Sequence, residues 1–321
     1  MRGWRRFLAH WQNWLGLLLV ALFFFVALAA PWLSPQDPAE PGPIRFVGRT
    51  IDYLPKPPSA EAPLGTLPGQ ISVFHSLVWG TRSALVFGLA VALFTALVGV
   101  VVGTLSAYFG GFLNGLLMRL TDAFLAFPII AGVVLIQQLL SIALANAGAH
   151  FAYSGIPSST TGYIQIPENL PFWLDLLNRL NSVSVAFILF SWMPYARIMN
   201  TMVLRAKQTQ YIQAARALGA GHSNLIFRHL IPNSITPIIV LAARDVGGMV
   251  LLQATFTFIG LGGGSLWGNL LVWGRDYIIS PGGLLTYWWV FLPATLTLVL
   301  FGIGWNLLGD GLNDLLNPRT R

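Results

Sequence analysis

Two charged residues, Arg244 and Asp245, stand inside an otherwise apolar stretch from about Ser234 to Ile259. Charges at membrane depth are costly, so they usually face a partner or a water-filled cavity. Adjacent residues on a helix do not face each other, so the two need separate partners. Gln253, eight residues after Asp245, is expected near the same helical face. Two interpretations stay open: these side chains line a path for a solute, or they pair with another span.

The other residues that could take part in catalysis or metal binding are scattered along the chain. There are 5 histidines, 11 acidic residues and no cysteine, which excludes thiolate metal sites and a cysteine nucleophile. Four histidines are expected in or beside loops, and no His-Glu-x-x-His pattern occurs; they are His75, His150, His222 and His229. We therefore expect no catalytic residue, no metal ligand and no cofactor in this chain. A membrane-embedded enzyme is a minor alternative.

Composition places these residues in a membrane protein. Of 321 residues, 55% are hydrophobic and 9% are charged, against about 25% charged in a soluble domain. About 20 apolar residues cross a bilayer as a helix, and clustered apolar runs predict an all-α fold with six such spans. The runs are Trp14 to Leu33, Ser83 to Tyr108, Ala123 to Ala145, Ser182 to Val203, Ser234 to Ile259 and Leu284 to Leu308.

The segments between the spans suggest the domain organisation. We expect the N-terminus and first helix over 1–33, a Pro-rich loop over 34–80, a transmembrane domain over 81–310 and a tail over 311–321. The first span resembles a signal peptide near Ala27 to Ala29, but its length favours an uncleaved anchor. In the long loop over 146–181, residues 173–180 are spaced as one amphipathic helix. That helix either lies in the membrane interface or covers the bundle.

Basic residues predict the orientation. One side carries both termini, the 109–119 turn and the 204–233 loop, and it is denser in Lys and Arg than the other. This denser side should be cytoplasmic, in the inner or plasma membrane, with both termini inside. The net charge of +7 is then a signal of topology, and no nucleic-acid partner is expected. Arg197, beyond the end of its apolar run, is expected to extend toward the nearer surface.

The cytoplasmic loop over 204–233 is expected to form a helix, a tight turn and a second helix. Tyr211, Ala215 and Leu218 share one helical face, and Gly219 suits the left-handed residue that ends such a helix. Ser223 is expected to cap the second helix, which runs toward Pro232. An exposed helix of this kind either docks into a partner's groove or rests on lipid.

The loop also carries a motif. Gln213-Ala214-Ala215, three residues, Gly219, nine residues and then His229-Leu-Ile-Pro232 resemble the EAA loop of ABC importer permeases, whose pattern is Glu-Ala-Ala, three residues, Gly, nine residues, Ile-x-Leu-Pro. Further matching motifs extend over roughly 80% of the chain, and together they resemble the C-type permease of dipeptide, oligopeptide and nickel ABC importers. The motifs are Pro63 to Thr66, Met118-Arg119, Asp122, Phe127-Pro128, Tyr195 to Arg197, Phe258 to Gly262, Trp267 to Asn269, Gly274-Arg275, Asn306 to Leu312 and Asn317 to Arg319.

This resemblance implies a type I importer with six transmembrane helices. A coupling helix containing Gln213, Ala214, Ala215 and Arg216 would sit in a cleft of a cytoplasmic ATPase, and Gly219 and Pro232 would bound the loop. The partners implied are two ATPases that hold ATP and Mg, a homologous second permease forming a heterodimer, and an external substrate-binding protein. Peptides are the implied solute, and nickel or another small solute is the alternative substrate. An ATP-independent transporter is an alternative function. Asp245 would then meet a peptide's amino group.

The chain departs from this family pattern at three places. Gln213 stands where the family has Glu, so a charged contact at the coupling helix is replaced by an amide. Leu67 to Gln70 replace the usual acidic continuation after Gly65-Thr66. The loop over 146–181 is long for the family, and the last two departures lie on the expected external face.

Overall fold

The computed structural model describes residues 10–38, 41–48, 53–146, 150–152, 163–165, 182–279 and 286–316. Helices dominate these residues, and the strands form two short antiparallel ribbons, so the all-α class is confirmed. The elements are α2 (Trp11–Leu33), β1 (Thr66–Leu67), η1 (Pro68–Gln70), β2 (Ile71–Ser72), α3 (Val73–Phe109), α4 (Gly111–Ala126), α5 (Ile129–Asn146), β3 (His150–Ala152), β4 (Tyr163–Gln165), α7 (Ser182–Ser191), α8 (Met193–Lys207), α9 (Gln210–Ala217), η2 (Asn224–Leu230), α10 (Ile231–Ser234), α11 (Thr236–Phe258), α12 (Leu266–Gly274), η3 (Arg275–Tyr277) and α13 (Trp288–Leu316).

Four described helices are long and apolar enough to cross a membrane, namely α2, α3, α11 and α13. The pair α4 and α5 raises this number to five if it is taken as one bent span. The predicted count of six is therefore not fully confirmed. The amphipathic helix expected over 173–180 lies outside the described residues.

The expected single span from Ala123 to Ala145 is wrong in shape. Helices α4 and α5 are bent by 91° at a break before Pro128. Phe127 has an extended backbone, with φ −83° and ψ 129°, which is the conformation favoured before proline. The turn expected within 109–119 is also shorter, because Gly110, with φ 70°, ends α3 and α4 begins at Gly111.

The expected span from Ser182 to Val203 is likewise divided. Helix α7 ends at Ser191 and α8 begins at Met193, with Pro194 in its first turn. Proline is tolerated there because the first N–H groups of a helix have no partner within it. Helix α3, in contrast, begins ten residues before the expected Ser83, because the Ser72 side chain accepts a hydrogen bond from the His75 N–H and caps an earlier start.

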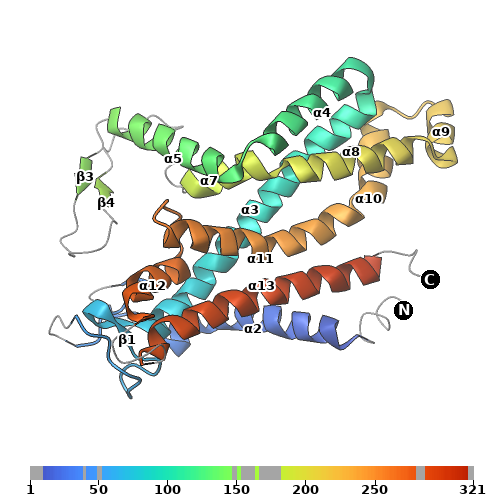
Figure 1. Ribbon diagram of the computed structural model, residues 1–321. Helices are drawn as coiled ribbons and strands as arrows, with labels where there is room; N and C mark the ends of the chain where they lie inside the picture. The colour runs from blue at the N-terminus through green and yellow to red at the C-terminus, as the bar shows by residue number, and fades with distance from the viewer. Residues whose placement is uncertain are drawn as a thin grey trace.

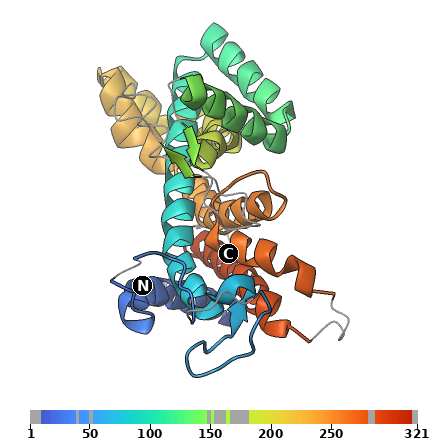
Figure 2. The same cartoon turned by 90° about the vertical axis from the view of Figure 1, so that its left-hand side faces the viewer.

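Helix α3 runs through the middle of the molecule (Figures 1 and 2). Its glycines allow close approach to neighbours on two sides. A Cβ on Gly88 would lie 2.9 Å from the Val246 carbonyl oxygen of α11, and one on Gly103 would lie 2.8 Å from Met199 Cβ of α8. Gly99 and Gly103, four residues apart, both pack against α8, as pairs of small residues do in membranes.

Buried side chains form two clusters. We call the first the aromatic core: Phe23, Trp267, Phe301 and Trp305 bring together α2, α12 and α13. We call the second the loop core: Tyr108, Ile212, Leu225, Ile226 and Leu230 join the end of α3 to the segment that follows α8. The start of α2, the end of α13, the α3–α4 turn and α9 all lie at one end of the molecule (Figure 1).

Candidate functional site

The site begins with the short helix α9, at the end of the molecule where the chain turns back from α8. Gly219 has φ +80°, and the Ala220 N–H donates to the Ala215 carbonyl oxygen at 3.0 Å, so the expected left-handed helix end is present. The expected apolar face is wrong in part. Leu218 is 88% exposed and Tyr211 is also exposed, whereas Ile212 is fully buried in the loop core.

The second helix of the loop differs from its expected form. Ser223 has helical φ and ψ of −60° and −45° and makes no side-chain cap, and residues Asn224–Leu230 form a π-helix. The Ile231 N–H accordingly donates to the carbonyl oxygen of Ile226, five residues back. Pro232 accounts for this widening, because its ring has no N–H and would clash with the carbonyl four residues earlier in an α-helix.

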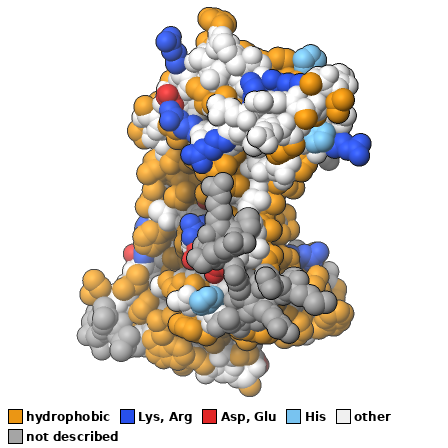
Figure 3. Space-filling view, turned by 90° about the vertical axis from the view of Figure 1, so that its right-hand side faces the viewer, with side chains coloured by type: hydrophobic (Ala, Val, Ile, Leu, Met, Phe, Trp, Pro, Cys, Tyr) orange, Lys and Arg blue, Asp and Glu red, His pale blue; other side chains and the backbone are white. Residues whose placement is uncertain are grey.

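The outward side of α9 is free for a partner to contact. Gln213, Ala214 and Arg216 are exposed, and Ala215 is half-buried against the loop core. The Gln213 amide makes a long hydrogen bond of 3.5 Å to the Gln208 carbonyl oxygen. Figure 3 looks onto this end of the molecule, where Lys and Arg side chains gather. An anionic or polar groove would complement this surface.

The charges within the fifth expected span have separate partners, as the helix geometry predicted. Arg244 forms an ion pair with Asp310 of α13. The Tyr195 hydroxyl of α8 donates a hydrogen bond of 2.6 Å to Asp245. Contacts within the chain therefore hold both residues, and the group bonded to Asp245 is a hydroxyl rather than a cation.

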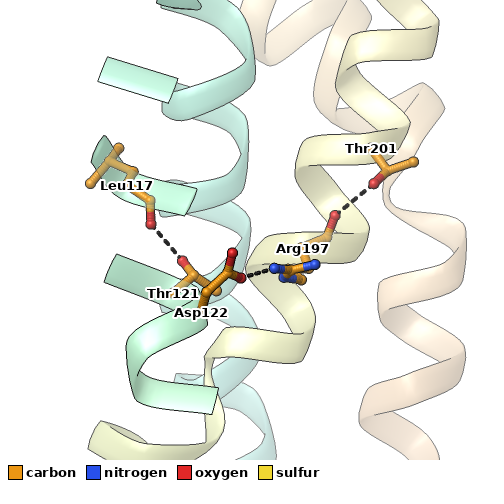
Figure 4. Close-up of polar contacts among 5 residues, drawn as sticks. All are labelled: Leu117, Thr121, Asp122, Arg197 and Thr201. Carbon is orange, nitrogen blue, oxygen red and sulfur yellow. Dashed lines mark hydrogen bonds and ion pairs between the residues drawn. The ribbon is translucent and has the colours of Figure 1, made fainter. Parts of the chain in front are cut away.

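Arg197 was expected only to extend toward the nearer membrane surface, but its side chain also has a partner. It forms an ion pair with Asp122 of α4, and the neighbouring hydroxyls of Thr121 and Thr201 bond back to their own helices (Figure 4). Both side chains of the pair are about half exposed, at 51% and 49%. This pair ties α4 to α8. Sequence reasoning had named both residues but had not joined them, because they lie 75 positions apart.

A mostly apolar cavity of about 540 Å³ lies beside the first half of α3. Its polar lining includes Arg82, Ser184 and Gln253, and Trp79 lies beneath the Arg82 guanidinium at 5.9 Å from the ring centre. Gln253 is buried and its amide donates to the Gly263 carbonyl oxygen at 2.8 Å. Gln253 thus lies at this cavity, while Asp245 bonds to α8.

His75, expected near a loop surface, is instead fully buried in the first turn of α3. Its Nδ1 lies 2.7 Å from Ser34 Oγ and its Nε2 lies 3.0 Å from the Gly42 carbonyl oxygen. It ties the segment after α2 to α3. Within the described ranges, no group of three His, Asp or Glu side chains is placed to hold a metal ion.

Long apolar helices around one central helix, with an exposed two-helix loop at one end, are features of an integral membrane protein. The chain belongs to the family of binding-protein-dependent transport system inner membrane components, whose model matches residues 99–321. Residues 2–56 match the N-terminal transmembrane domain of oligopeptide transport permease C. The resemblance seen in the motifs is thereby confirmed.

Three relatives show how far the likeness extends. The chain is 30% identical to the di/tripeptide transport system permease protein of Pseudomonas aeruginosa, over 99% of this chain and 91% of the relative. It is 28% identical to the glutathione transport system permease protein of Pectobacterium atrosepticum, over 99% and 90%. It is 27% identical to the oligopeptide transport system permease protein of Bacillus subtilis, over 98% and 88%.

Proposed function

We propose that this chain is the permease subunit of an ATP-driven importer of peptides and that α9 is its coupling helix. The observation that carries the proposal is the exposed α9, fixed by the buried Ile212 and followed by Gly219 in the motif's position. Relatives named for di/tripeptide, glutathione and oligopeptide transport support peptides as the solute, in preference to nickel. ATP and Mg belong to two cytoplasmic ATPase partners.

The proposed orientation follows from the same site. The end with α9, the start of α2 and the end of α13 faces the cytoplasm, and the segments over 34–80 and 146–181 face outward toward a substrate-binding protein. The Lys and Arg side chains at the α9 end support this orientation. A homologous second permease completes the path beside residues 81–310, and residues 311–321 form the cytoplasmic tail.

The proposed path includes Asp245, with Arg244 beside it and Gln253 at the outer cavity. The Tyr195 hydroxyl is neutral and does not form an ion pair with Asp245, so an ionised Asp245 could attract a peptide's amino group. Replacing Asp245 with Asn keeps the size and the hydrogen bond to Tyr195 but removes the charge. We expect peptide uptake to fall at least about tenfold, with assembly intact. Tyr195→Phe is the control, and equal uptake by Asp245→Asn and the wild type would remove Asp245 from the path.

The function is tested by reconstituting both permeases and both ATPases in vesicles with a peptide-loaded binding protein. Uptake should require ATP, and an α9 variant with Ala215→Asp, which places a charge beside the loop core, should lose both uptake and co-purification of the ATPases. Gly221→Ala, in the same loop with nothing within 4 Å of the added Cβ, is the matched control. Uptake that persists without any ATPase would overturn the proposal.

A further inference from the structure

The cytoplasmic end of α3 makes an unusual set of polar contacts with the loop that carries α9. An α-helix leaves its last four carbonyl groups without partners inside the helix. In α3 the Ser106 carbonyl oxygen accepts from the Gly110 N–H. The next two, those of Ala107 and Tyr108, accept hydrogen bonds from Lys207 Nζ at 2.8 and 2.9 Å. The last residue of α8 therefore caps the end of α3.

Lys207 is held firmly in this position. A cation near a helix C-terminus is attracted by the helix dipole, in addition to its two hydrogen bonds. Partial burial, and then the charge of nearby Arg216, lower the pKa of the Lys207 ammonium group. Two cations that repel each other are thus kept together at one place, which indicates that their shared contacts outweigh the repulsion.

The shared contact is the ring of Tyr108, which is buried in the loop core. Lys207 Nζ lies 5.9 Å from the ring centre, and the Arg216 guanidinium of α9 lies 5.8 Å from it. Beyond the ring, the Tyr108 Oη is hydrogen-bonded to His222 Nδ1 at 2.6 Å. The His222 ring packs edge-on against Tyr108, with ring centres 5.6 Å apart. Tyr108 thus touches the loop before α9, on it and after it.

We infer that Tyr108, Lys207, Arg216 and His222, here called the loop clamp, are positioning residues that link movement of α9 to movement of α3. This inference rests on the proposed function. Helix α3 packs through Gly103 against α8 and through Gly88 against α11, which carries Asp245. A force on α9 therefore reaches α3 directly through the clamp, in addition to the chain connection through α8. Without the clamp, α9 stays docked to the ATPase but moves without turning α3.

The test is the number of peptides transported per ATP hydrolysed in the complete transporter. Tyr108→Phe removes only the hydroxyl, so the ring contacts and the loop core remain. We expect this ratio to fall about threefold or more, the scale of one lost hydrogen bond, while ATPase co-purification and ATP hydrolysis are kept. Tyr277→Phe is the matched control, because it loses one hydrogen bond, to the Tyr53 carbonyl oxygen at 3.0 Å, outside this end of the molecule.

Two further variants protect the test against a folding defect. Lys207→Met keeps the length of the stem but removes both hydrogen bonds to α3. His222→Ala changes an exposed side chain, and combined with Tyr108→Phe it should lower the ratio no further than either change alone.

A wild-type transporter without ATP-dependent uptake would overturn the proposed function and the inference with it. A wild type that transports, together with clamp variants that keep the wild-type ratio, would overturn the inference alone. Clamp variants that lose uptake and ATP hydrolysis in equal proportion would also overturn it, because that result indicates a structural role.

Discussion

The two halves of the molecule on either side of α3 are packed to very different degrees. In the half formed by α2, α11, α12 and α13, the aromatic core is closed, and Trp267 is 1% exposed. In the half formed by α4, α5, α7 and α8, Thr121 is the one described residue of α4 that is buried, and Phe112 is 86% exposed. The first half encloses a core between its helices, although its outer face is apolar and exposed as well, as at Leu28 and Trp32 of α2. The second presents apolar surface that lipid or a partner protein must cover.

The largest effect is expected in the closed half. Trp267→Ala removes a ring that contacts Phe23 and Phe301 and a hydrogen bond of 3.1 Å to the Leu77 carbonyl oxygen. We expect the free energy of unfolding in detergent to fall by about 3–5 kcal/mol. Trp32→Ala, at a side chain that is 82% exposed, is the control. Equal losses for both would contradict the comparison.

The next effect concerns the seam that holds the open half to α3. A Cβ at Gly103 would lie 2.5 Å from the Ala196 carbonyl oxygen, so Gly103→Val must push α8 away. We expect a loss of about 1–3 kcal/mol, measured by the same unfolding experiment. Gly115→Ala in α4 has nothing within 4 Å of the added Cβ and should be far milder. A tolerated Gly103→Val would show that this seam is loose.

A smaller effect is expected for the two ion pairs, one in each half. Asp122→Asn and Asp310→Asn each leave an arginine without its carboxylate, but all four side chains are about half exposed. We expect each change to lower stability by about 1 kcal/mol or less. Combining Asp310→Asn with Arg244→Gln should restore part of that loss. A much larger loss at either pair would indicate that it is buried in the membrane rather than screened.

The smallest effect on the isolated chain is expected on the bare face of α4. Leu116 is 52% exposed, so Leu116→Ala should change the stability of the isolated chain by no more than about 0.5 kcal/mol. If a second permease covers this face, the same change should weaken the assembled transporter more clearly, as measured by its dissociation in detergent. If Leu116→Ala destabilises the isolated chain as much as Trp267→Ala does, the side chain of Leu116 must be packed inside the chain rather than exposed.

The sequence was sufficient where one apolar run makes one straight helix. Helices α2, α3, α11 and α13 follow from hydrophobic length alone, since each run exceeds the thickness of the bilayer core. It was insufficient at the α4–α5 bend and the α7–α8 break, because hydropathy reports neither the extended backbone of Phe127 nor the end of α7 at Ser191, just before Pro194. Pro128 could have indicated the α4–α5 bend, but proline is also tolerated in the first turn of an unbroken helix, so it did not decide between the two.

The candidate site was predicted in outline only. The sequence of the loop predicted a helix at α9 and a left-handed Gly219 at its end, because both depend on residues close together in the chain. The buried face of α9 was misassigned, since which of Tyr211, Ile212 and Leu218 turns inward depends on where α3 ends. The partners of Arg244 and Arg197 depend on the packing of distant helices, which no spacing in one sequence encodes.

The central claim is that an ATPase covers the exposed side of α9. Because the chain has no cysteine, Gln213→Cys introduces a single reactive thiol on that side. In the complete transporter this thiol should crosslink to an ATPase subunit, and Phe46→Cys, on the segment after α2, should not. Crosslinking of Phe46→Cys to the ATPase, or labelling of Gln213→Cys by an impermeant reagent added outside intact cells, would contradict the account.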